Sequence, residues 1–105
     1  MFGDMFGDMQ ERQKAMRQKL AGITIEAESG DGAVRVKANA NREIVNIAFD
    51  KSKLDWEDQE MVEDLLIAAI NHALEKAAAK EAEEAQNALK DMLPPGLDGL
   101  DGLFG

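Results

Sequence analysis

The chain has 105 residues and contains no cysteine, which excludes a disulfide framework and any cysteine-based metal or redox site. It also lacks tyrosine, and it holds only one histidine and two prolines. No apolar run approaches the roughly 20 residues that a membrane-spanning helix needs, and neither end resembles a signal peptide. We therefore expect a soluble, intracellular protein with one small core and no membrane partner.

Catalytic groups are equally scarce. The only histidine is His72, no set of His, Asp and Glu residues has metal-ligand spacing, and no phosphate-cradling glycine motif is present. Ser29 and Ser52 fall in predicted turns with no base nearby in sequence. This inventory predicts a protein that is not an enzyme and that needs no metal and no cofactor. An unrecognised enzyme remains an alternative.

The most informative stretch is a predicted helix from Asp55 to Met92, with Asp55 as its N-cap and Pro94-Pro95-Gly96 beyond its end. At 100° per residue it has two apolar faces, and two faces need two partners. The first face is predicted to cover a sheet and consists of Val62, Leu65, Leu66, Ala69 and Ala73. The second has the spacing of a coiled-coil seam and consists of Ile67, Ile70, Leu74, Ala78, Ala82, Ala85, Leu89 and Met92.

The length of this helix points to a second chain. Nearly forty helical residues span roughly 55 Å at 1.5 Å per residue. A compact chain of this size has a radius of gyration of only about 13 Å. We therefore predict a homodimer whose interface contains the second face, although a solvated helical tail is the alternative, since Ala-, Glu- and Lys-rich sequence is helical by default.

Before the long helix the sequence predicts a short helix and three strands. The helix runs from about Asp8 to Leu20. The strands alternate with period two, and a hairpin at Ser29–Gly32 joins the first two. The expected pairs are Ile25 with Val36, Ala27 with Val34 and Glu26 with Arg35. Asn41 is suited to positive φ in the second turn. The third strand is expected to point Val45, Ile47 and Phe49 toward the helix.

Charge divides the chain into two unlike halves. The net charge is −9, but residues 1–54 hold nine basic and eight acidic residues, whereas residues 55–105 hold three and thirteen. Seven basic residues of the first half are candidates for binding an anionic partner: Arg12, Lys14, Arg17, Lys19, Arg35, Lys37 and Arg42. We expect one domain over residues 1–96, followed by a flexible Gly/Leu/Asp tail over residues 97–105.

Several segments, in order and at matching spacing, resemble the YbaB/EbfC family of small bacterial nucleoid-associated proteins. They are Gly32–Val36, Ile47–Ser52, Asp58–Leu66, Ala68–Ala73 and Leu93–Gly96. The resemblance implies an α+β fold: an N-terminal helix, a three-stranded antiparallel meander and a long C-terminal helix, assembled as an intertwined homodimer. It also implies DNA binding with weak sequence preference, in the cytoplasm and at the nucleoid.

Two functions follow as hypotheses. In the first, a homodimer binds duplex DNA and shapes the nucleoid or influences gene expression. Its contacts are expected to go to phosphates, because no base-reading motif is visible. In the second, suggested by the net charge, an acidic dimeric adaptor or chaperone-like module binds a basic protein partner. The placement of the basic residues in space separates the two.

Overall fold

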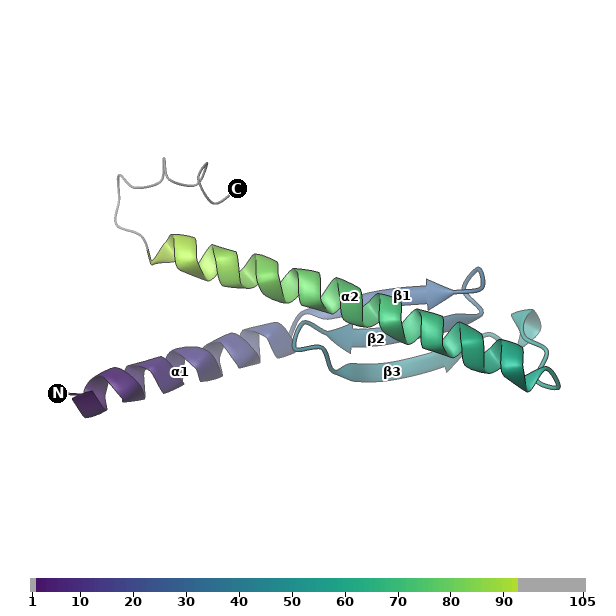
Figure 1. Cartoon of the computed structure of the whole chain (residues 1–105), viewed down its shortest axis with the longest axis horizontal. Helices are drawn as coiled ribbons and strands as arrows, with labels where there is room; N and C mark the ends of the chain where they lie inside the picture. Colours follow the sequence, from purple (N-terminus) through teal and green to yellow (C-terminus); the bar gives the residue numbers. More distant parts are fainter. Residues whose placement is uncertain (1, 93–105) are drawn as a thin grey trace.

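An antiparallel three-stranded sheet with one helix across its face and another helix beyond its end forms the fold (Figure 1). It is seen in a computed structural model that describes residues 2–92, with side chains from Met5 onward. The elements are α1 (Phe2–Ala21), β1 (Thr24–Ser29), β2 (Val34–Asn39), β3 (Ile44–Phe49), the 3-10 turn η1 (Lys51–Lys53) and α2 (Gln59–Asp91). This order confirms the predicted α+β fold. The expected tail at 97–105 lies outside the described residues.

The core lies between α2 and the first two strands. Ala69, Ala73 and Ala77 lie one helical turn apart and are 0% exposed. Their small side chains let the helix backbone lie close to Val34 and Val36, the largest fully buried side chains. The first apolar face of the helix therefore covers the sheet, as predicted.

α2 covers fewer strands of the sheet than predicted. α2 packs against β1 and β2, while every residue of β3 is exposed. Ile47 and Phe49 pair with the buried Val36 and Val34 and so share their face of the sheet, yet each remains 37% exposed. Phe49 finds one aromatic neighbour, Trp56, at 5.2 Å between ring centroids. The expectation that the helix covers all three strands is wrong, because α2 crosses the sheet on the side of β1 (Figure 1).

An irregularity in β3 changes which of its residues lie on the inner face of the sheet. The ladder shifts register at Lys37 and Ala38, so that Ala38 pairs with Ile44 rather than with Val45. A bulge of this kind inserts one extra residue and reverses the side on which the next residues lie. The prediction for Val45 is therefore wrong: it is strongly exposed, and Ile44 takes the place on the inner face.

The first hairpin is also displaced by two residues from its predicted register. Ala27 pairs with Val36 and Glu26 pairs with Lys37, whereas Glu26 was expected opposite Arg35. The reason is a four-residue turn over 30–33, in which Gly30, Asp31 and Gly32 all have positive φ. A shift by two residues keeps each side chain on its predicted face, because strand side chains alternate with period two.

Both helices begin at other residues than predicted. Asp58, not Asp55, is the N-cap of α2, and its carboxylate accepts a hydrogen bond from Met61 N at 3.2 Å. Asp55 instead accepts from Glu57 N at 3.0 Å in the preceding turn. α1 begins at Phe2 rather than near Asp8, so it is longer than the apolar and basic pattern indicated.

The turn between β2 and β3 is organised by the side-chain amide of Asn39, a buried residue. Asn39 Oδ1 accepts from Asn41 N at 2.9 Å and from Glu43 N at 3.3 Å. The residue with positive φ is Arg42, at 63°, and not Asn41. A left-handed conformation costs a residue with a Cβ roughly 1–2 kcal/mol, so this turn holds an arginine where glycine would be relaxed.

We predict that Arg42→Gly is more stable than Arg42→Ala by about 1 kcal/mol, because both lose the charge but only glycine relieves the positive φ. Urea denaturation of both variants at one protein concentration measures the difference. Equal stability of the two would contradict the assignment of strain to this turn.

Candidate nucleic-acid interface

The last turn of α1 fixes the whole helix to the rest of the chain. Leu20 is buried, and its carbonyl oxygen accepts a hydrogen bond from Ala40 N at 3.1 Å. Asn41 Nδ2 donates to Arg17 O at 2.9 Å. From this junction α1 projects past the end of the sheet (Figure 1). The helix is thus an arm that is anchored at its C-terminal end.

The arm carries unpaired positive charge. Arg12, Lys14 and Arg17 are all exposed, and none forms an ion pair with another described residue. They lie within five residues of each other, with Lys14 and Arg17 one turn apart on the helix surface. The arm is also apolar near its start, where Met5 and Met9 are exposed rather than packed within this chain.

At the anchored end, two cations meet carboxylates of α2. Lys19 Nζ lies 2.9 Å from Glu84 Oε2, and Arg42 Nε lies 3.4 Å from Glu81 Oε2. The hydrogen bond between Lys19 and Glu84, together with their opposite charges, raises the pKa of Lys19 and lowers that of Glu84. Sequence reasoning missed both carboxylates, because nothing in the linear pattern brings residues so far apart together.

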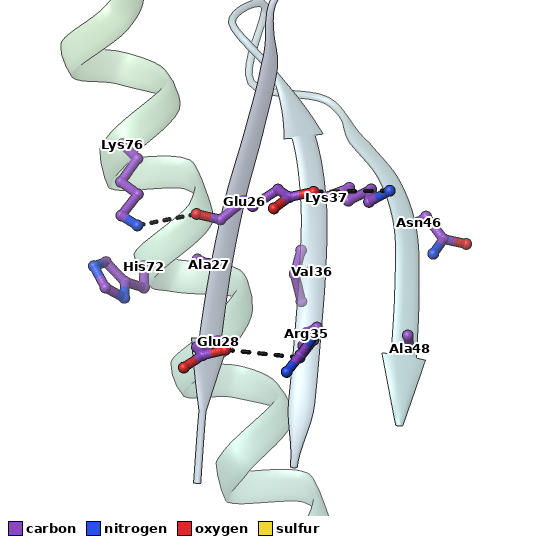
Figure 2. A pocket seen from close by; sticks show the side chains of 10 residues that line it. All are labelled: Glu26, Ala27, Glu28, Arg35, Val36, Lys37, Asn46, Ala48, His72 and Lys76. Carbon is purple, nitrogen blue, oxygen red and sulfur yellow. Dashed lines mark hydrogen bonds and ion pairs between the residues drawn. The ribbon is translucent and has the colours of Figure 1, made fainter. Parts of the chain in front are cut away.

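The outer face of the sheet pairs its charges across strands. Lys37 Nζ and Glu26 Oε1 are 3.7 Å apart, as are Arg35 Nε and Glu28 Oε2 (Figure 2). Lys76 of α2 adds a hydrogen bond to Glu26 O at 2.9 Å. These groups and the exposed His72 line a hollow of about 650 Å³ in which acids and bases alternate. Pairs this exposed contribute little to stability.

The structure thus sorts the seven candidate DNA-binding residues into two groups. Three of them have no carboxylate partner among the described residues: Lys14 and Arg17 on one side of the arm, and Arg12 on another. The other four each have a carboxylate of their own chain within 3.7 Å or less: Lys19, Arg35, Lys37 and Arg42. Their role toward DNA stays a prediction.

The second apolar face of α2 has few contacts within the chain. Ile67, Leu89 and Met92 are each more than half exposed, and Leu74 and Ile70 are partly buried. A hollow of about 760 Å³ lies beside this face, between α2 and the turn that holds Arg42. The remaining residues of the predicted seam are exposed alanines: Ala78, Ala82 and Ala85.

Two further findings concern the described residues alone. Residues 2–92 contain no group of His, Asp and Glu side chains placed to hold a metal ion. Neither helix in this range combines the length and the hydropathy that crossing a bilayer requires.

Comparison with known proteins adds the decisive observation. The sequence model of the YbaB/EbfC DNA-binding family matches residues 1–92. The chain belongs to the YbaB/EbfC DNA-binding family. The members of this family compared below come from bacteria and carry the name nucleoid-associated protein.

Relatives match this YbaB/EbfC chain over most of its length. A protein of Pelotomaculum thermopropionicum is 38% identical and covers 85% of each chain. One of Thermodesulfovibrio yellowstonii is 36% identical and covers 100% of this chain and 95% of its own. The crystal structure of the uncharacterized protein HP0035 from Helicobacter pylori is similar in fold. Its TM-score is 0.70 at 25% identity, covering 84% of this chain and 92% of the other.

The Lys19–Glu84 pair predicts a pH dependence of stability. The pKa of Glu84 lies below its ordinary value of 4.5, so its contribution is present above 4.5 and is lost as the pH falls through the lowered value. Wild type should therefore exceed Glu84→Gln in free energy of unfolding at neutral pH, and the two should converge in acid. Urea denaturation across pH measures this, with Glu83→Gln as a neighbouring control. A gap that persists well below 4.5 would contradict the assignment.

Proposed function

We propose that the protein is a nucleoid-associated homodimer that binds duplex DNA with little sequence preference, through contacts between DNA phosphates and α1. The observation that carries the proposal is a set of three exposed cations on the projecting arm that form no ion pair with any described residue: Arg12, Lys14 and Arg17. Membership of a DNA-binding family supports DNA as the ligand.

The chemistry of these side chains favours phosphate over base contacts. Arginine and lysine bind phosphate oxygens by charge and hydrogen bonding, and such contacts carry no sequence information directly. The described elements include no helix-turn-helix or zinc finger that would read base edges. The net charge of −9 opposes association. Affinity near physiological salt should therefore stay within the usual nonspecific range, with Kd on the order of micromolar or weaker.

Binding rather than catalysis is proposed as the role of the chain. Within the described residues, the hollow on the sheet contains paired acids and bases but no nucleophile held beside a base. A protein that neutralises phosphates along a duplex acts by coating or shaping it. Influence on nucleoid organisation or gene expression is the expected consequence.

Replacing Arg12, Lys14 and Arg17 together by Gln should weaken binding equally to unrelated duplexes. The slope of log K against log salt should become shallower by about 0.9 for each phosphate that the variant no longer neutralises. Gln preserves helix propensity, so the arm itself should remain helical. Fluorescence anisotropy with two duplexes of unrelated sequence, at several salt concentrations, gives both quantities.

The matched control removes the same charge elsewhere, by changing Lys51, Lys76 and Lys90 to Gln. If this control weakens binding as much as the α1 variant, general charge and not the arm is responsible. If wild type binds no duplex even at low salt, the adaptor hypothesis takes precedence, and capture of a basic protein partner becomes the relevant assay.

Dimerisation is the second part of the proposal. Three apolar surfaces are exposed in the single chain: the start of α1, the inner side of β3 and the second face of α2. Soluble monomers rarely expose large contiguous apolar patches, so these exposed apolar residues favour a partner. The radius of gyration is 19.2 Å, against about 13 Å for a compact chain of this length, so much of the surface lies far from any intrachain partner.

A second copy is the simplest cover for these surfaces. The proposed interface is the predicted α2 seam: Ile67, Ile70, Leu74, Ala78, Ala82, Ala85, Leu89 and Met92. Its alanines permit close approach of a second helix, and its leucines and methionine supply the larger apolar contacts. β3 is an edge strand of the sheet, so its outer backbone groups could also pair with a second chain.

Leu89→Asp should disrupt the dimer, because it places a charge in an apolar interface at a cost of several kcal/mol. Ala79→Asp is the matched control, since Ala79 is exposed on the same helix but lies off both apolar faces. Multi-angle light scattering should give a dimer for wild type and for the control. A dimer of unaltered stability for Leu89→Asp, or a monomeric wild type, would refute the proposed seam.

A further inference from the structure

The two ion pairs at the base of the arm join basic and acidic parts of the chain. Lys19 follows Arg12 by seven residues, which is about two helical turns, so the two side chains lie on the same side of α1. Arg42 lies near the anchored end of α1, because its turn is tied to that helix by the hydrogen bond from Asn41 Nδ2 to Arg17 O. Both cations therefore lie where a duplex bound to the arm would extend, yet each is held by a carboxylate of α2.

The exposures of the paired side chains are unequal. Lys19 is 58% exposed, whereas the Glu84 side chain is only 11% exposed. The cation thus faces solvent with its carboxylate behind it. If Lys19 paired with a DNA phosphate instead, Lys80 Nζ at 3.8 Å would be the remaining ion-pair partner of Glu84 among the described residues. Leaving a nearly buried carboxylate with a single distant partner costs free energy, and this cost opposes the exchange. The Arg42–Glu81 pair is longer and its acid is 36% exposed, so it is the weaker of the two.

We propose that Glu84, and more weakly Glu81, withhold Lys19 and Arg42 from DNA, so that α2 limits how much of the basic surface takes part in binding. The proposal rests on the proposed DNA-binding function of α1. The sheet pairs are different, because at 3.7 Å their acids are more than half exposed and yield readily to a competing phosphate.

A double-mutant cycle on DNA binding tests this. Glu84→Gln should raise affinity and steepen the salt slope by about 0.9 for each Lys19 that gains a phosphate. Lys19→Gln alone should change binding little, because Glu84 already holds Lys19 in the wild type, but it should abolish the gain in the Glu84→Gln background. Glu83→Gln is the matched control: it makes the same change in net charge one residue away, at a carboxylate that pairs only with Lys80 among the described residues.

The outcomes separate the two proposals. If Glu84→Gln and Glu83→Gln change the affinity for DNA equally, Glu84 does not withhold Lys19. The same conclusion follows if Lys19→Gln lowers the affinity equally in the wild type and in Glu84→Gln. Either result would leave the proposed DNA binding intact. No binding by any of these proteins at low salt would overturn the proposed function and this inference together. Glu81→Gln provides a second pair, with a smaller expected gain, and circular dichroism verifies that each variant is folded.

Discussion

The packing of α2 onto β1 and β2 through alanine is the contact on which the rest of the structure depends. Ala69, Ala73 and Ala77 bring the helix close to the sheet, but a helix packed so closely on two strands does not reach the third. Among the described residues, the largest fully buried side chains of the resulting core are two valines, Val34 and Val36. β3 and the second face of α2 are left without cover, and this incomplete burial is the physical reason for proposing a dimer.

The same geometry sets the charge distribution. The acidic helix passes the anchored end of α1, where its carboxylates meet the nearest cations, while the projecting part of the arm lies beyond their reach. Net charge is therefore a poor guide to this chain. The arm carries three exposed cations that form no ion pair with a described residue, although the protein has a net charge of −9. Salt dependence, rather than affinity alone, is the property that reflects this arrangement.

Periodicity predicted the order of the elements, the buried face of α2 and the face of nearly every strand residue, because apolar spacing directly reflects which side is buried. It did not predict the four-residue turn over 30–33 or the bulge at Val45, because several turn and bulge geometries are compatible with the same alternation. It did not predict the cap at Asp58 either, because Asp55 and Asp58 are both suitable N-cap residues. The pairing of Lys19 with Glu84 was beyond sequence reasoning, since it depends on where α2 crosses the sheet. The seven candidate cations could be named from composition, but only the tertiary structure divides them into paired and unpaired groups.

The central claim is that α1 is the surface that meets DNA. Titration of ¹⁵N-labelled protein with a short duplex at low salt, followed by two-dimensional NMR, tests it most directly. The account predicts that the amide signals of residues 10–19 shift most, and that two duplexes of unrelated sequence give the same pattern. Shifts confined to the outer face of the sheet or to α2, with α1 unaffected, would contradict it.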